Sequence, residues 1–274
     1  MTWPQRLCLK RFLLNDRMRG RVALPNGAHR SELSAPEGAT TNAEPIMQSF
    51  PLPHYNCRRA PRPLVLTGKL DDPLWQVASL AYLHDALTGA PARFATTVRA
   101  LYDAEYLYVA FACEDDYVWG TITAHDGPIY EEECVEIFLN PANAGHQYYE
   151  INVSPCNVVF DACILNARTP EQPHASFLGL KEWHVEGLRT AVHVEGELNQ
   201  PGQAKSWSAE FAIPFRALIG APHVPPQVGD EWRINFYRID TPPLDAKSEL
   251  YAWSTTEFPT FHLPWKFGRM RFEE

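Results

Sequence analysis

The stretch that decides the fold is residues 134–153, CVEIFLNPANAGHQYYEINV. Apolar residues occupy every second position on both sides of Pro141, and Glu136, Glu150 and Asn152 occupy intervening positions. A period of two is that of a β-strand, whose successive side chains point to opposite faces of a sheet. The stretch therefore predicts two strands with one face in a core and one face that carries polar groups.

Similar short runs, separated by turn residues, continue on both sides of this stretch. The predicted strands are 64–66, 96–102, 106–114, 134–140, 146–153, 158–163, 188–195, 205–213, 231–239, 250–254 and 267–272. Helix is expected only in short pieces at 73–79 and 214–219. Strands at nearly regular spacing favour an all-β fold, a two-sheet antiparallel β-sandwich of the jelly-roll or immunoglobulin-like kind with short helices.

Composition narrows the possible partners. The chain has 274 residues, 45% of them apolar, and no run approaches the roughly 18 apolar residues that cross a bilayer. Its net charge of -9 would repel a nucleic-acid phosphate backbone. The six cysteines show no CxxC spacing, so buried thiols are expected. We therefore expect a monomer with neither a membrane span nor a nucleic-acid partner.

The first 46 residues differ from the rest of the chain. Residues 27–45 hold few large apolar side chains, which predicts a disordered leader. Residues 12–14 are too short an apolar run for an ordinary signal peptide, so the sequence does not support export. Alternatively, Met47 is the true start and the leader is an artefact of the gene model. Either way, the sandwich domain is expected over 47–274.

Seven blocks appear in one order along this domain. They are LTGKLDDPLWQVAS (66–79), VRALYDAEYLYVAFACED (98–115), ECVEIFLNP (133–141), YYEINVSP (148–155), WSAEFAIPF (207–215), INFYRID (234–240) and AWS with FGRMRF (252–272). Together they resemble the family 9 carbohydrate-binding modules over roughly 55–274. The resemblance implies a DOMON-like β-sandwich that binds oligosaccharides or polysaccharides without cleaving them. It also implies a link to the breakdown of plant polysaccharides such as xylan and cellulose, and to secreted or periplasmic proteins.

The resemblance also assigns positions in a sugar site. Relatives hold the sugar between two aromatic rings, and these positions fall on Tyr130 and Phe261. The family's acidic residue falls on Glu136. A family arginine falls on Glu150, which is a reversal of charge and puts the inherited hydrogen-bonding scheme in doubt. Arg238, on the INFYRID strand, is a candidate to supply the missing positive charge from a neighbouring strand.

Further candidates complete the expected site. Asn152 shares the polar face and would hydrogen-bond sugar hydroxyls, and Trp119 in a loop is a candidate for a third stacking platform. No cofactor is expected. Calcium is possible because relatives contain it, with Asp115, Asp116 and Asp126 as candidate oxygen ligands.

Two alternative functions stay open. Glycoside hydrolysis uses two flanking carboxyl groups, a role that Glu136 and Glu150 could take in a hydrolase or in its accessory domain. A haem-binding DOMON-like domain would need axial ligands, and Met270 with His262 are the candidates near the C-terminus.

Overall fold

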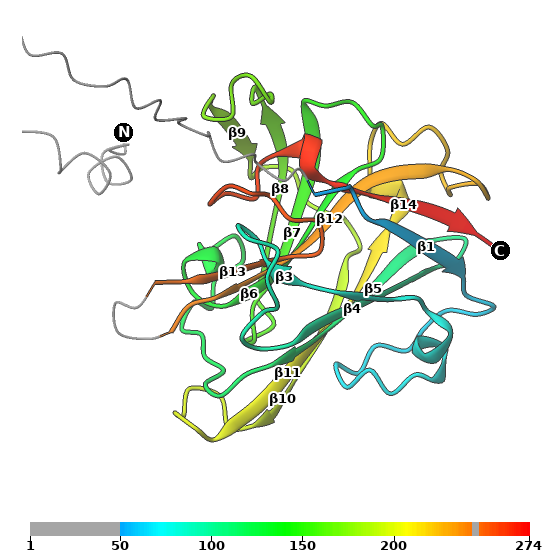
Figure 1. The fold of residues 1–274 in the computed structure, drawn as a ribbon. Helices are drawn as coiled ribbons and strands as arrows, with labels where there is room; N and C mark the ends of the chain where they lie inside the picture. The colour runs from blue at the N-terminus through cyan, green and yellow to red at the C-terminus, as the bar shows by residue number, and fades with distance from the viewer. Residues whose placement is uncertain (1–49, 243–246) are drawn as a thin grey trace, which may run out of the picture. The chain divides into compact units, whose positions relative to one another are not determined.

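The computed structural model describes residues 50–242 and 247–274, so the predictions for the leader lie outside the described residues. Fourteen strands run through this part of the chain (Figure 1). They are β1 (His54–Arg59), β2 (Leu80–Tyr82), β3 (His84–Asp85), β4 (Thr96–Tyr102), β5 (Tyr106–Glu114), β6 (Cys134–Asn140), β7 (Gln147–Val153), β8 (Val159–Asn166), β9 (Phe177–Leu180), β10 (Arg189–Gly196), β11 (Ala204–Pro214), β12 (Glu231–Asp240), β13 (Glu249–Ala252) and β14 (Gly268–Glu273). The short 3-10 helices are η1 (Pro73–Val77), η2 (Ile129–Glu131), η3 (Phe215–Ala217) and η4 (Pro264–Lys266).

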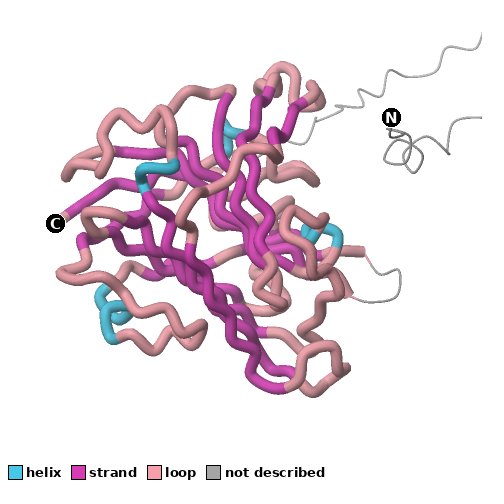
Figure 2. Tube along the Cα trace, turned by 180° about the vertical axis from the view of Figure 1, so that it is seen from behind, coloured by secondary structure: helices cyan, strands magenta, loops and turns pink. Residues whose placement is uncertain are grey.

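The strands form one curled sheet. Its main path is β10-β11-β5-β4-β1-β14-β12-β6-β7-β8-β9. Strand β1 pairs in parallel with both β4 and β14, and it thereby joins two otherwise antiparallel halves. Figure 2 shows the strands of the two halves from behind. The sheet is therefore mixed, and the prediction of two separate antiparallel sheets is corrected at β1.

The main hydrophobic core lies between the two halves. The rings of Phe111 on β5 and Phe236 on β12 meet at 6.0 Å between centroids, edge to face. Val135, Ile137 and Leu139, the alternating residues of the opening motif, are fully buried in this core. The predicted period of two is therefore confirmed in β6, and burial of this apolar surface is the principal force that holds the halves together.

Two smaller clusters cover the outward faces of the halves. On one half, Trp75 of η1 packs over β5 and donates from Nε1 to Glu210 Oε1 at 2.7 Å. On the other half, Phe261, Phe267 and Ile129 cover the outward face of β6, β7, β8 and β12. The face that the alternation predicts to be polar is thus roofed by loops.

Most predicted strands are confirmed within one to three residues at their ends. The prediction for 64–66 is wrong, because this segment is irregular and passes over the outward face of the first half. Strands β1, β2, β3 and β9 were not predicted. Three of them span only two to four residues, and β1 has only two alternating buried residues, Tyr55 and Cys57. The helices predicted at 73–79 and 214–219 are present as the shorter 3-10 helices η1 and η3. Among the described residues, no helix has the length and apolarity required to cross a bilayer.

Candidate functional site

The candidate site is a row of four side chains across the outward face of one half-sheet. Tyr237 on β12 is the register partner of Glu136 on β6, Glu136 is the partner of Asn152 on β7, and Asn152 is the partner of Phe160 on β8. Directly opposed residues in neighbouring strands point to the same face. Two polar groups therefore lie between two aromatic rings, over about 14 Å at the usual strand spacing.

Loop aromatics cover both ends of the row. Phe261 stacks on Tyr237 with 4.0 Å between ring centroids and 12° between planes. Tyr130, from η2, meets Phe160 edge to face at 5.3 Å. Tyr130 is 36% exposed, whereas Phe261 is only 6% exposed. The row is consequently more accessible at the Tyr130 end than at the Phe261 end.

Phe261 corrects one expectation. The aromatic clamp requires two exposed rings that face each other, and Phe261 is instead buried in the outward cluster. The physical reason is Tyr237, whose fully buried ring gives Phe261 a stacking partner inside the protein. A direct role for Phe261 in sugar binding stays a prediction.

Glu136 and Glu150 form a buried acidic pair on this face. Burial, followed by repulsion from Glu150, raises the pKa of Glu136 well above its usual value. Burial also raises the pKa of Glu150 to about 7, opposed by the amide of Asn152 and the ammonium of Lys181. The pair therefore holds protons near neutral pH and offers both hydrogen-bond donors and acceptors.

In the described part of the chain, only one of the two polar side-chain atoms of Asn152 has a hydrogen-bond partner. Its Nδ2 donates to Glu150 Oε1 at 2.9 Å, whereas its buried Oδ1 has no hydrogen-bond partner among the described residues. A buried acceptor without a donor costs about 1–3 kcal/mol. This oxygen is therefore the polar atom of the row that would gain most from a hydroxyl group.

His262 closes the row beside Glu150. Its Nδ1 lies 2.7 Å from the Tyr148 hydroxyl, and its Nε2 lies 4.0 Å from Glu150 Oε2. Burial, with a smaller contribution from Arg168, lowers the pKa of His262 to about 3. The imidazole is therefore neutral at physiological pH and adds no positive charge next to the glutamates.

Lys181 provides the positive charge at this site. Its Nζ lies 4.8 Å from the centroid of Phe160 and 5.9 Å from that of Tyr130, over both rings. Its charge also lowers the pKa of Glu150. The sequence analysis missed Lys181, which follows β9 in a loop without a motif. It also missed Phe160 and Tyr237, although the alternation of their strands could have placed them.

Arg238 lies elsewhere, and its predicted placement beside Glu150 is wrong. It pairs with Val135 on β6, which points to the main core, so its side chain is on the opposite face from Glu136. There its fully buried guanidinium donates to Asp115 Oδ2 at 2.5 Å and lies 3.5 Å from Asp240. The positive charge of Arg238 therefore compensates the buried carboxylates of Asp115 and Asp240 in the interior of the sandwich.

Trp119 is partly buried next to the end of β12. Its Nε1 donates to the carbonyl oxygen of Thr241 at 2.6 Å, which ties the loop after β5 to that strand. The indole N–H is thus already used inside the protein. A stacking role for this residue stays a prediction.

The three aspartates proposed for calcium lie in separate environments. Asp115 pairs with Arg238, and Asp116 forms an exposed ion pair with Arg93 at 3.7 Å. Asp126 belongs to another cluster, described below. The predicted grouping is therefore wrong, because the loop after β5 directs each carboxylate to a different partner. Calcium binding elsewhere stays a prediction.

The haem ligands suggested by the sequence do not meet. Met270 is buried in the main core, whereas His262 contacts Phe138 and Tyr148 in the outward cluster. The two residues are on opposite faces of the same half-sheet, so they cannot ligate one iron.

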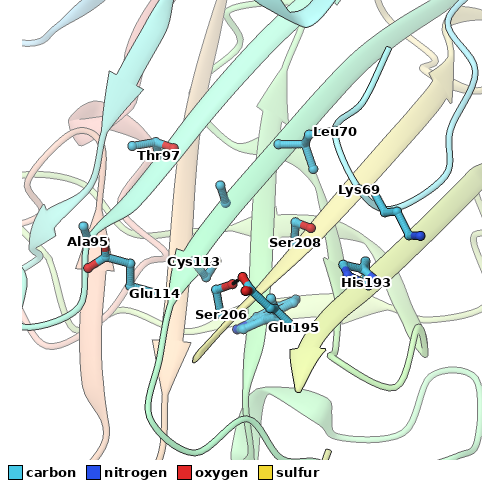
Figure 3. Close-up of a pocket in the computed structure, with 12 residues that line it drawn as sticks. Lys69, Leu70, Ala95, Thr97, Cys113, Glu114, His193, Glu195, Ser206 and Ser208 are labelled. Carbon is cyan, nitrogen blue, oxygen red and sulfur yellow. Dashed lines mark hydrogen bonds between the residues drawn. The ribbon is translucent and has the colours of Figure 1, made fainter. Parts of the chain in front are cut away.

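A hollow of about 350 Å³ lies on the other half of the sheet, over β4, β5, β10 and β11. Figure 3 shows Ser206 and Glu195 within it, joined by a hydrogen bond of 3.1 Å. Ser208 already donates to the carbonyl of Gly68 at 2.5 Å. Trp207, which is almost fully buried, is the one Phe, Tyr or Trp residue that lines this hollow, so no exposed ring of these three types is available there for stacking.

The chain is similar to known proteins both in its sequence family and in its fold. Residues 66–274 match the family described as carbohydrate family 9 binding domain-like. The search of curated proteins found no match. Several solved structures share the fold at low sequence identity, among them the three that follow.

One is a protein from Bacteroides uniformis to which carbohydrate binding has been ascribed. It has 16% identity and a TM-score of 0.63, over 81% of this chain and 100% of that chain. The others are structures of a family 9 carbohydrate-binding module from Caldicellulosiruptor kristjanssonii. The glucose complex has 13% identity and a TM-score of 0.55, over 81% and 96% of the two chains. The cellotriose complex has 13% identity and a TM-score of 0.54, over 81% and 94%.

Proposed function

The chain belongs to the carbohydrate family 9 binding domain-like family, and from this premise we propose that it binds a plant-derived oligosaccharide or polysaccharide chain on the outward face of β6 and β7. Glu136, Glu150 and Asn152 hydrogen-bond the sugar hydroxyls. Tyr130 stacks on the sugar ring at the open end of the row. The protein holds the sugar without cleaving it.

The observation that carries the proposal is the aromatic–Glu–Asn–aromatic row itself. Sugar rings present apolar C–H faces and polar edges, so a binding face needs aromatic rings beside hydrogen-bonding groups. The unpartnered Oδ1 of Asn152 accepts a hydroxyl, and the glutamates donate or accept according to their protonation. The glucose and cellotriose complexes of the fold relatives support β-linked glucose units as the first ligands to try.

Entry to the row is from the Tyr130 side. Tyr130 and Lys181 are both exposed, and exposed side chains change rotamer within nanoseconds. Lys181 lies over both rings at this end, so its side chain swings aside when a sugar arrives. Its ammonium then remains close enough to donate to a sugar hydroxyl. Lys181 would thereby replace the family arginine, whose position is occupied here by Glu150.

Calorimetric titration with glucose, cellotriose and xylotriose tests the proposal. We expect heat from at least one sugar, with affinity at least about tenfold weaker in Tyr130→Ala and in Glu136→Gln, a loss of about 1.4 kcal/mol or more. Lys181→Gln is expected to weaken binding less, because its contact is solvated. Ser206→Ala, in the hollow on the other half-sheet, is the matched control and should bind as wild type.

Three results would contradict the proposal. The first is the absence of heat with every sugar, and the second is binding that Tyr130→Ala leaves unchanged. The third is binding that only Ser206→Ala abolishes, which would move the site to the hollow on the other half-sheet. Turnover of a chromogenic xyloside that Glu136→Gln abolishes would instead favour a glycoside hydrolase.

A further inference from the structure

Four side chains from three separate segments converge at one edge of the β6–β7–β8 half-sheet. His125 and Asp126 come from the loop between β5 and η2, Asp161 comes from β8, and His184 comes from the connection between β9 and β10. One nitrogen or oxygen atom of each residue lies within 4.8 Å of the corresponding atoms of the other three. Neither the family match nor the sugar site assigns a role to this cluster.

The donor atoms are close enough together to approach the spacing of a tetrahedral metal site. His184 Nδ1 lies 3.1 Å from Asp161 Oδ1 and 3.8 Å from Asp126 Oδ2, and His125 Nδ1 lies 3.1 Å from Asp126 Oδ2. Tetrahedral Zn²⁺ with bonds of about 2.0–2.1 Å separates its ligand atoms by about 3.4 Å. These three distances fall on both sides of this value, so side-chain movements would bring the four atoms into one ligand shell.

The two carboxylates are oriented by the backbone. Asp161 is buried, and its Oδ2 accepts from the Val185 N–H at 2.7 Å, which leaves Oδ1 for the cluster. Asp126 has a left-handed backbone with φ of 59°, and its Oδ1 accepts from the Asp161 N–H at 3.3 Å. Its Oδ2 is then directed at both imidazoles. Such outer hydrogen bonds hold ligands in place in metal sites.

We propose that His125, Asp126, Asp161 and His184 bind a divalent transition-metal ion, with Zn²⁺ as the best-fitting ion. Imidazole nitrogens and carboxylate oxygens are both ligands of Zn²⁺, and four such atoms match its usual coordination number. Calcium prefers six to eight oxygen ligands, so this site differs from the calcium that the family resemblance implies. The second acidic cluster, Asp115, Glu133 and Asp240, offers only oxygens, and two of its members, Asp115 and Asp240, are already paired with Arg238.

Bound metal would connect three segments that flank the sugar row. Asp126 precedes Tyr130 by four residues, Asp161 follows Phe160 directly, and His184 follows Lys181 by three residues. The ion would therefore limit the movement of both loops at the open end of the row. The metal proposal itself does not depend on sugar binding, and its test uses no sugar.

The test is titration of metal-free full-length protein with Zn²⁺ alone, followed by calorimetry and by elemental analysis after dialysis. We expect one Zn²⁺ per chain, and binding at least about tenfold weaker in His184→Ala and in His125→Ala. These side chains are 54% and 56% exposed, so their removal leaves no cavity. His174→Ala, at another exposed histidine, and Cys156→Ser, at a partly exposed thiol, should bind as wild type.

Spectroscopy supplies a second readout. Co²⁺ in place of Zn²⁺ should give the intense visible absorption of a tetrahedral site, and this band should be absent in the double variant His125→Ala/His184→Ala. Stoichiometric Zn²⁺ binding that survives in the double variant would overturn the proposal, as would no binding to wild type or tighter binding of Ca²⁺ than of Zn²⁺. Far-UV circular dichroism of the metal-free variants confirms that they are folded.

Discussion

Glu136 and Glu150 lie on the same face of adjacent strands, diagonal to each other across the β6–β7 pair, beneath a roof of loop residues. Both carboxyls are more than nine-tenths buried, and the pKa of each is raised, chiefly by burial. Neutral carboxyls can be buried at far lower cost than charged ones. The half-sheet therefore has a stability that depends on protons held on its outward face.

The protein should become less stable as the pH rises above 4.5. Because the pKa of Glu150 rises from 4.5 to about 7 on folding, the folded state holds more protons than the unfolded state between these values. The free energy of unfolding should fall across this range, by at most roughly 3 kcal/mol for this group. Glu150→Gln removes this titrating carboxyl and should flatten the fall, as measured by urea unfolding from pH 5 to pH 8. A variant with the wild-type slope would contradict this account.

His262 should produce the opposite slope. Its pKa drops from 6.5 to about 3 on folding, so below pH 6.5 the unfolded state binds the proton that the folded state excludes. Stability is therefore present above pH 6.5 and is lost as pH falls towards 3, by an upper limit of about 4–5 kcal/mol. His262→Gln keeps a hydrogen-bonding group near Tyr148 and should be less sensitive to acid in urea unfolding measured from pH 3 to pH 7. Equal acid sensitivity of variant and wild type would show that His262 is protonated when folded.

Arg238 should behave as a structural cation. Arg238→Met leaves Asp115 and Asp240 buried without their partner, which we expect to cost about 3–5 kcal/mol in the free energy of unfolding. The double variant Arg238→Met/Asp115→Asn should recover part of that loss, because it removes one of the uncompensated charges. Loss of sugar affinity without loss of stability in Arg238→Met would instead restore Arg238 to the binding face.

Trp75 should affect stability alone. Trp75→Phe keeps most of the buried ring but removes the Nε1 donor to Glu210, whose other carboxylate oxygen accepts from Thr67 and Gly68. Loss of one donor to a buried charge should cost about 1–3 kcal/mol in thermal or urea unfolding. Sugar and Zn²⁺ titrations should be unchanged, because η1 covers the other half of the sheet. A change in either titration with normal stability would contradict this separation.

Local alternation explains why much of the fold could be predicted. In β6 and β7, the apolar residues at every second position must face a core, and this requirement alone identifies the strands and their polar face. Strands with fewer alternating residues escaped detection, as did β1, which buries only Tyr55 and Cys57 in this way. Its parallel pairing with β4 and β14 joins segments that are distant along the chain, and no short-range signal reports it.

The candidate site was predicted only in part. Glu136 and Asn152 share a face because their strands pair in register, and the alternation of each strand already places them there. Arg238 was placed wrongly because its face depends on the register between β12 and β6 and on the buried acids that surround it. Lys181 and His184 lie in a connection whose path depends on the packing of the whole half-sheet.

The sequence by itself determined the strand periods, the order of the family blocks and the polar face of β6 and β7, because each depends on neighbours within a few residues or on the linear order of the chain. Only the tertiary structure decided that Phe261 stacks on Tyr237, that Lys181 rather than Arg238 approaches Glu150, and that two histidines meet two aspartates. These contacts join residues far apart in the chain. They arise from strand register and loop packing, which short-range sequence patterns do not encode.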